Sequence, residues 1–273
     1  MAIILKQAVY NADKTECLEI GYEWYDNQIS IIPFPRTIKK VPSALPKEIT
    51  SLELAFSRNQ NAFINGIQDW DTSNITNMNY MFCWAKNFNQ DISSWKTSKV
   101  KYMSFMFYGA KNFNQDISSW KTSNVTNMRF MFARAKNFNQ DISMWNTSNV
   151  TNMAGMFSSA YSFNQNISMW DVSNVTDMSF MFYEAKNFNQ DISSWKTSNV
   201  TNMRFMFARA KNFNQDISMW NTSNVTDMSF MFYEAKNFNQ DISNWNVLNI
   251  ENSNNFSSSD SKWKPEHHPQ FNN

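Results

Sequence analysis

Tryptophan recurs every 25 residues through most of this 273-residue chain, and no insertion or deletion interrupts the spacing. A fixed period of this size is typical of repeat proteins, in which one unit cannot bury its own apolar face and stacks on its neighbours instead. The period therefore predicts one elongated body of stacked coils. The tryptophans that define it are Trp70, Trp95, Trp120, Trp145, Trp170, Trp195, Trp220 and Trp245.

Other apolar residues keep fixed places relative to each tryptophan. After Trp120, apolar residues from Val125 to Phe138 follow one another mostly in steps of three, which indicates a helix or 3-10 segment with one buried face. Before it, polar residues flank Ile117, as in a short strand over 115–119. We expect these columns to form the core, with methionine filling gaps between aromatic rings. The expected core includes Trp95, Trp120, Trp145, Trp170, Trp195, Trp220, Ile117, Met128, Met131 and Phe132.

The predicted fold is an α/β repeat solenoid. Each 25-residue unit would form a leucine-rich-repeat-like, right-handed coil with one short parallel strand and one short helix or 3-10 turn. Residues 1–50 are expected to cap the N-terminal end and to contain a β-hairpin around Asp26 and Asn27. Residues 51–250 would form about eight coils, and residues 251–273 a degenerate C-terminal cap with a polar, mobile tail, from which Trp263 can fold back on the last coil.

The string FNQDISSWKTSNVTNMRFMFARAKNFNQDIS resembles the 25-residue repeat of BspA-like leucine-rich surface proteins, and in particular the lipoprotein-associated repeat of mycoplasmas. The segment 32–42 also resembles the stretch that precedes such repeats. The resemblance implies a leucine-rich-repeat-like fold, exposure on the cell surface and adhesive roles, and it implies no enzyme. The chain shows neither a lipid-attachment cysteine nor a recognisable signal peptide in residues 1–10, so a cytoplasmic location stays open.

One acidic and serine-rich pair of columns flanks the inward-facing isoleucines and is predicted to line the outer face of the sheet. Like charges stacked on successive strands repel one another, so two explanations are open. Each carboxylate accepts corner amides or pairs with a lysine such as Lys86, Lys111, Lys136, Lys186, Lys211 or Lys236. Alternatively, the face binds a cationic or hydroxyl-rich ligand, or weakly binds Ca²⁺. The candidate residues are Asp91, Ser93, Asp116, Ser118, Asp141, Ser143, Ser168, Asp191, Ser193, Asp216, Ser218, Asp241 and Ser243.

Two further polar patterns have structural explanations. Asparagine columns, one running from Asn89 to Asn239, are expected to bond to each other and to backbone groups at tight corners. Glu184, Arg209 and Glu234 occupy one column in three successive coils and predict an ion ladder between coils.

Composition and motifs argue against several classes of function. The net charge of +1 would not attract a nucleic acid or an anionic membrane, and no apolar run approaches the roughly 20 residues of a membrane span. Cys17 and Cys83 match no metal or redox pattern and are expected to be inert thiols. No glycine-rich phosphate loop or nucleophile–base signature is present, and His267 and His268 alone are a poor metal site. We therefore expect no enzyme, cofactor or metal, and a monomer.

The preferred hypothesis is a non-enzymatic protein of the cell surface that presents an extended face to host proteins or glycans, as an adhesin or variable surface antigen. A cytoplasmic scaffold that gathers partner proteins is the alternative. An ice- or mineral-binding array is weaker, because the regular Thr and Asn columns are placed at corners and not on a flat sheet. The identity of the ligand is not encoded in any motif.

Overall fold

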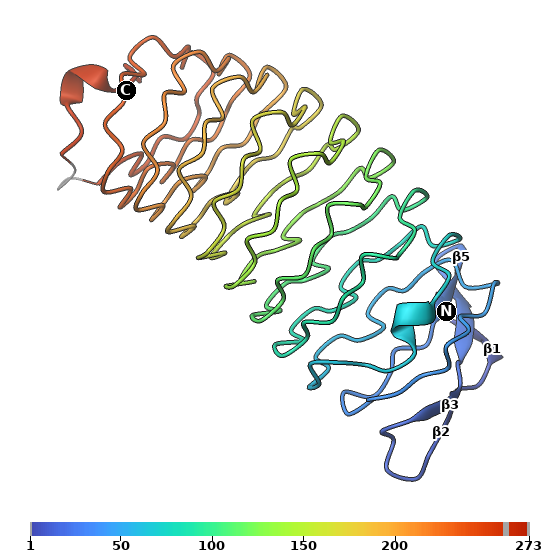
Figure 1. The fold of residues 1–273 in the computed structure, drawn as a ribbon. Helices are drawn as coiled ribbons and strands as arrows, with labels where there is room; N and C mark the ends of the chain where they lie inside the picture. Colours follow the sequence, from blue (N-terminus) through green and yellow to red (C-terminus); the bar gives the residue numbers. More distant parts are fainter. Residues whose placement is uncertain (1, 259–261, 272–273) are drawn as a thin grey trace.

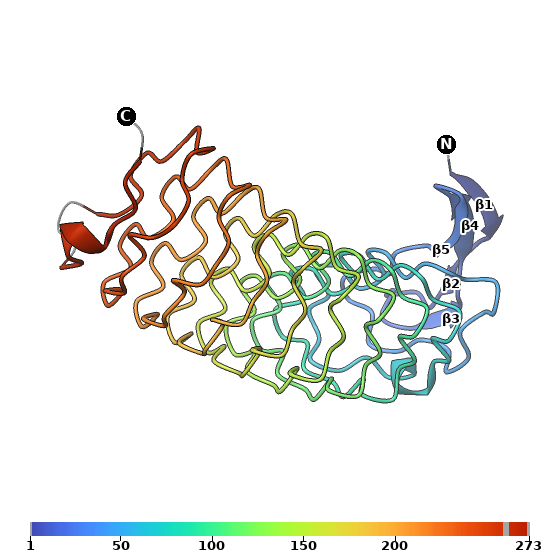
Figure 2. The ribbon, with the colours of Figure 1, turned by 90° about the horizontal axis from the view of Figure 1, so that it is seen from above.

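The computed structural model describes residues 2–258 and 262–271. The chain forms an elongated, gently curved stack of coils, with five short strands at the N-terminal end and the C-terminal segment at the other end (Figure 1). Viewed from above, successive coils follow one another along one axis, so that each contacts the coil before it and the coil after it (Figure 2).

The predicted α/β class is wrong. Among residues 2–258 and 262–271 there is no α-helix, and the only helical elements are two 3-10 turns, η1 (Ile67–Asp69) and η2 (Pro265–His267). The only sheets in this part are antiparallel and belong to the N-terminal end. One has the order β1-β4-β5 and the other pairs β2 with β3. Their bounds are β1 Ile3–Lys6, β2 Val9–Tyr10, β3 Cys17–Glu19, β4 Tyr22–Tyr25 and β5 Gln28–Ile31.

Each coil is built from turns where a strand and a helix were expected. The segment 115–119 around Ile117 has no strand and ends in a turn at Ser118 and Ser119. In the segment 125–138, Phe130 and Arg134 have φ values of 52° and 59°, a left-handed backbone through which a right-handed helix cannot continue. The apolar spacing was misleading because these turns also bond residues three apart. The N–H of Met131 donates to the carbonyl of Met128 at 3.1 Å, and the equivalent methionines of other coils form the same bond at 3.3 Å or less.

Hydrogen bonds between coils alternate along the turn-rich segment. The N–H groups of Met128, Phe130, Phe132 and Arg134 donate to carbonyls of the next coil at 2.7–3.0 Å. Only one residue per coil forms a parallel bridge to both neighbours, as in the series Asn77, Tyr102, Asn127, Asn152, Asp177, Asn202, Asp227 and Asn252. The coils are therefore held in register by single bridges and by alternating backbone bonds, without strands.

The core runs through the whole stack and consists of aromatic, methionine and aliphatic columns. Phe107 and Phe132, in adjacent coils, stack with ring centroids 5.7 Å apart. Each tryptophan of the 25-residue column is almost fully buried, and its indole N–H donates to a backbone carbonyl 28 residues earlier, as from Trp145 to Ile117 at 3.2 Å. The structure buries all of the expected core residues, namely Trp95, Trp120, Trp145, Trp170, Trp195, Trp220, Ile117, Met128, Met131 and Phe132.

Both ends of the stack are covered. At the N-terminal end β4 and β5 form a hairpin whose turn residues, Asp26 and Asn27, both have positive φ, as a type I′ turn requires. At the C-terminal end Trp263 is buried, contacts the ring of Phe238 at 4.8 Å and donates its indole N–H to Gln240. The part of the expected mobile tail over 262–271 is therefore packed on the last coil, and the rest of that tail, 259–261 and 272–273, lies outside the described residues.

Candidate binding faces along the coils

The predicted acidic and serine residues lie in register on successive coils, but they do not line a sheet, because no sheet exists there. We call these residues the acidic row. Each aspartate is exposed and accepts the backbone N–H of the serine two residues later, at 2.8 Å for Asp116 and Ser118. The same bond, at 2.8–3.0 Å, joins Asp91 to Ser93, Asp141 to Ser143, Asp191 to Ser193, Asp216 to Ser218 and Asp241 to Ser243, and Asn166 makes it to Ser168.

These bonds explain how the carboxylates tolerate their stacking. The backbone and side-chain bonds from Ser118 hold the pKa of Asp116 below its usual value, and the corresponding serines do the same for the pKa of Asp91, Asp141, Asp191 and Asp241. The neighbouring charge of Asp116 opposes this by raising the pKa of Asp91 and Asp141. The acidic row thus acts locally, as a set of turn caps.

The structure does not bring the acidic row together with the lysines proposed as its partners. In the described part of the chain, no ion pair joins the row to Lys86, Lys111, Lys136, Lys186, Lys211 or Lys236. Nor do three or more His, Cys, Asp or Glu side chains gather at one point among the residues described. Of the two kinds of partner in the first explanation, the structure shows the backbone amides and not these lysines.

Beside the acidic row lies a set of exposed methionines that the sequence analysis did not identify. Met144, Met169 and Met219 are 85%, 82% and 80% exposed. They directly precede tryptophan, in a column where other coils have serine, asparagine or aspartate. An apolar residue in an otherwise polar column indicates an exposed apolar side chain. The prediction missed it because it assigned methionine to the core.

A second row carries the positive charge. We call it the lysine ridge: one lysine in each coil from Lys86 to Lys236, except where Tyr161 takes the place. The tyrosine lies between neighbours of the same row, with the ammonium groups of Lys136 and Lys186 at 4.8 Å and 4.1 Å from its ring centroid. The members are Lys86, Lys111, Lys136, Lys186, Lys211 and Lys236.

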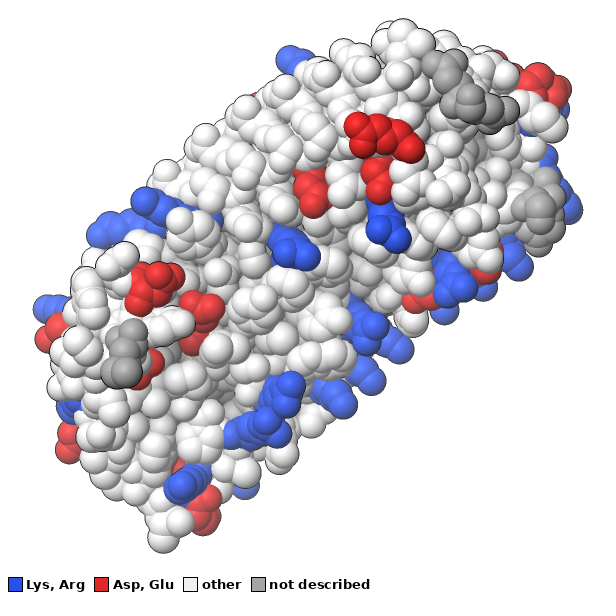
Figure 3. Space-filling view, turned by 180° about the vertical axis from the view of Figure 1, so that it is seen from behind, with Lys and Arg blue, Asp and Glu red and all other residues white. Residues whose placement is uncertain are grey.

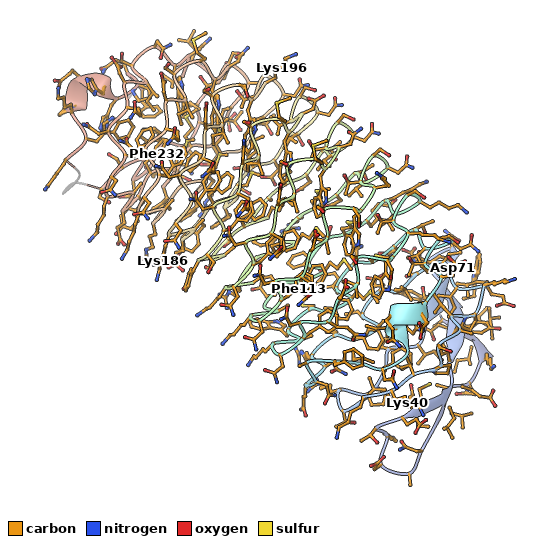
Figure 4. All side chains as sticks on the ribbon, viewed as in Figure 1. Lys40, Asp71, Phe113, Lys186, Lys196 and Phe232 are labelled. Atoms are coloured by element: carbon orange, nitrogen blue, oxygen red, sulfur yellow. The ribbon has the colours of Figure 1, made fainter. Side chains whose placement is uncertain are left out.

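The lysine ridge follows one long edge of the molecule. Figure 3 shows Lys and Arg side chains gathered along that edge, and Figure 4 places Lys186 on it and Lys196 on the opposite edge. In the described residues, none of the six ridge ammonium groups has a carboxylate within 4.0 Å or a hydrogen bond to the protein. The row therefore presents charges that other side chains do not neutralise.

A cavity of about 390 Å³ opens at the N-terminal end of the lysine ridge. Arg36, Arg58 and Lys86 line it together with the indole of Trp84, and the amide residues Asn59, Gln60 and Asn87 complete its wall. We call it the Trp84 cavity. A Cβ at position 109 would lie 2.5 Å from the Trp84 ring, so Gly109 leaves the room that this indole occupies. The cavity combines three cationic side chains with one aromatic surface.

The other polar patterns have structural roles, as expected. The side-chain carbonyl of Asn89 accepts the N–H of Asn114 at 2.9 Å, and this bond repeats from coil to coil up to Asn239. Arg209 pairs with Glu184 at 3.3 Å and with Glu234 at 3.1 Å, which confirms the ion ladder.

The two cysteines also match their prediction. Cys17 and Cys83 are free and buried, and burial raises the pKa of each thiol to about 11. At that pKa each thiol stays protonated and unreactive near neutral pH.

Comparison with known proteins gives one match. A family model described as a Mycoplasma protein of unknown function, DUF285, matches residues 50–170 and 161–267. Neither a curated protein nor a solved structure matches the chain. The more specific assignment to BspA-like proteins is not confirmed. No helix in the described part is long and apolar enough to cross a membrane.

Proposed function

Because the chain belongs to the DUF285 family of Mycoplasma proteins of unknown function, we propose that it is a non-enzymatic protein of the cell surface that binds a host protein or glycan along its coils. The observation that carries the proposal is the register of exposed side chains. Single parallel bridges at every coil fix equivalent residues one coil apart, so that a column in which the same residue type recurs becomes a row of like groups on the surface.

Such a row suits an extended ligand better than a small one. Each exposed side chain contributes little alone, since a solvated charge contact is worth roughly 0–1 kcal/mol. Several contacts made at once by one ligand add through effective concentration. The stack thus binds by repetition, and its affinity should rise with the number of coils that the ligand spans.

A binding screen of the isolated chain against host-cell glycans and surface proteins tests this function. Binding to a member of either class, with affinity that falls as coils are removed, is the expected result. The absence of any binding partner on a cell that the organism colonises would contradict the proposal.

Proteolysis of intact cells tests the location. An exported chain is trimmed by protease added outside the cell, whereas the cytoplasmic scaffold considered above is protected until the cell is lysed. Antibody against the N-terminal strands would identify the fragments, and a cytoplasmic enzyme of the same cells serves as the control.

A further inference from the structure

We propose that the lysine ridge and the Trp84 cavity form one continuous site for a linear polysaccharide that carries sulfate or carboxylate groups. This inference rests on the proposed function and names both the ligand class and the face that binds it. Lys86 belongs to both features, so the cavity is the end of the ridge.

The first argument is the contrast between the ridge and the surface beside it. The column two residues earlier holds Trp84, Gly109, Arg134, Ser159, Glu184, Arg209 and Glu234, of every chemical type. The column of Lys96, Lys121 and Lys196 on the other edge also contains Asp71 and Asp171. The ridge contains no acidic residue from Lys86 to Lys236, although packing does not require lysine there.

The second argument is geometric. Six steps of one coil separate Lys86 from Lys236, and at the spacing of adjacent β-bridged chains the row is about 29 Å long. A pyranose ring in an extended polysaccharide is about as long as one such step. Anionic substituents on successive sugars can therefore meet the ammonium groups of successive coils on either side of Tyr161.

The third argument is the chemistry of the two sides of the ridge. Each of the six ridge lysines is followed by an asparagine. Five of these asparagines, Asn112, Asn137, Asn187, Asn212 and Asn237, are exposed. Amide groups can donate to and accept from sugar hydroxyls. In the cavity, Arg58 and Arg36 offer planar donors that suit a carboxylate or sulfate, and the Trp84 ring offers a surface for a sugar face.

The same features disfavour a nucleic acid. Single-stranded nucleic acids need repeated aromatic platforms for their bases, and the only aromatic residue in the ridge is Tyr161, whose ring already contacts Lys136 and Lys186.

The test is a titration of the full-length chain with size-defined heparin oligosaccharides. The ridge variant combines Lys111→Gln, Lys136→Gln and Lys186→Gln. The control combines Lys96→Gln, Lys121→Gln and Lys196→Gln on the opposite edge, which changes the net charge equally. We expect the ridge variant to bind about tenfold more weakly with a shallower salt dependence, and the control to stay within twofold of the unsubstituted chain. Thermal melting of both variants checks that they fold.

Three results would overturn the proposal. Equal losses in the two triple variants would mean that only overall charge matters. Tighter binding of a single-stranded oligonucleotide or of anionic lipid vesicles than of heparin would assign the ridge to another class of ligand. Failure of the unsubstituted chain to bind heparin would exclude the ligand class, while the host-cell screen above would still decide the proposed function independently.

A single substitution tests the cavity as part of the site. Arg58→Gln should weaken binding of an oligosaccharide long enough to span the ridge by two- to fivefold. Unchanged affinity would separate the cavity from the ridge and overturn the continuous site.

Discussion

At the scale of single residues, the tryptophan column shows why this position requires an indole and not merely an apolar ring. The ring fills the core, and its N–H donates to a backbone carbonyl of the preceding coil, which also accepts one backbone N–H of its own turn. One such hydrogen bond contributes roughly 0.5–1.5 kcal/mol. The column therefore contributes both packing and backbone hydrogen bonding at every coil.

Trp145→Phe should separate these contributions. Phenylalanine keeps an aromatic ring in the core and removes the indole bond, while the carbonyl of Ile117 still accepts the backbone N–H of Trp120 at 3.2 Å. We therefore expect a loss of about 1 kcal/mol in the free energy of unfolding from the hydrogen bond, measured in urea, in addition to the packing lost with the smaller ring. The neighbouring Met144→Ala, at an 85% exposed position, should change stability by less than about 0.5 kcal/mol. Equal effects of the two substitutions would refute the role of the indole N–H.

The acidic row predicts a dependence of stability on pH. Five of its carboxylates, those of Asp91, Asp116, Asp141, Asp191 and Asp241, have a lower pKa in the folded chain than their ordinary value of 3.8. Their stabilising contribution is therefore present above pH 3.8 and is lost as the pH falls below it. Asn166 makes the same bond without a charge, so a variant with asparagine at positions 91, 116, 141, 191 and 241 should keep the turns. Its melting temperature should fall less than that of the unsubstituted chain between pH 5 and pH 2.

At the scale of the element, the buried columns of each coil can be predicted from the sequence, whereas its left-handed backbone positions cannot. The buried columns follow from residue type and period, because only apolar residues can occupy a continuous core. The backbone state does not follow, because most left-handed positions carry side chains such as Phe130 and Arg134 that do not favour it. Gly109 and Gly155, which fall in the same two columns, were the available signals, and a helical period of three obscured them.

The candidate site was predicted to a similar degree. The acidic row could be identified because its aspartate and serine recur at fixed places. The lysine ridge recurs as regularly, but the sequence does not show which columns adjoin in space, and the lysines were assigned to the aspartates as partners. The Trp84 cavity depends on residues from three different coils and on a single glycine, so that no local pattern marks it.

Ser159 has a φ of 55°, so the order of stability of its glycine and alanine variants tests whether the turn is left-handed. Ser159→Gly and Ser159→Ala both lose the hydroxyl bond to Glu184 and differ from each other only by a Cβ. In a helix interior alanine would be the more stable by about 0.5–1 kcal/mol. At a left-handed position we expect the reverse order, with glycine the more stable by about 1 kcal/mol in urea unfolding. The helical order would show that the turn description is incorrect.

At the scale of the whole molecule, each coil contacts only its two neighbours through bonds that repeat every 25 residues. Stability is then close to a sum of coil and interface contributions. No single coil is essential to the register of the others.

Deletion of residues 136–160, one complete coil, should leave a folded and shorter stack. The denaturant m-value should decrease in proportion to the surface removed, and near-ultraviolet circular dichroism should retain the signal of packed aromatic rings. Deletion of 12 residues from the same coil moves every later residue out of its column and should prevent the following coils from packing. Equal tolerance of both deletions would contradict a core held in register.

The indole bond also gives the stack a direction. Each tryptophan donates backward, to a carbonyl about 28 residues earlier in the chain. During synthesis the acceptor carbonyl is therefore made before the donor indole, and each new tryptophan can bond to a coil that is already complete. The backbone N–H groups of the turn-rich segment donate the other way, to the coil made next. A chain shortened at the carboxyl end should therefore keep every indole bond of its remaining coils, whereas a chain that lacks its first coils loses the acceptor of its first remaining indole.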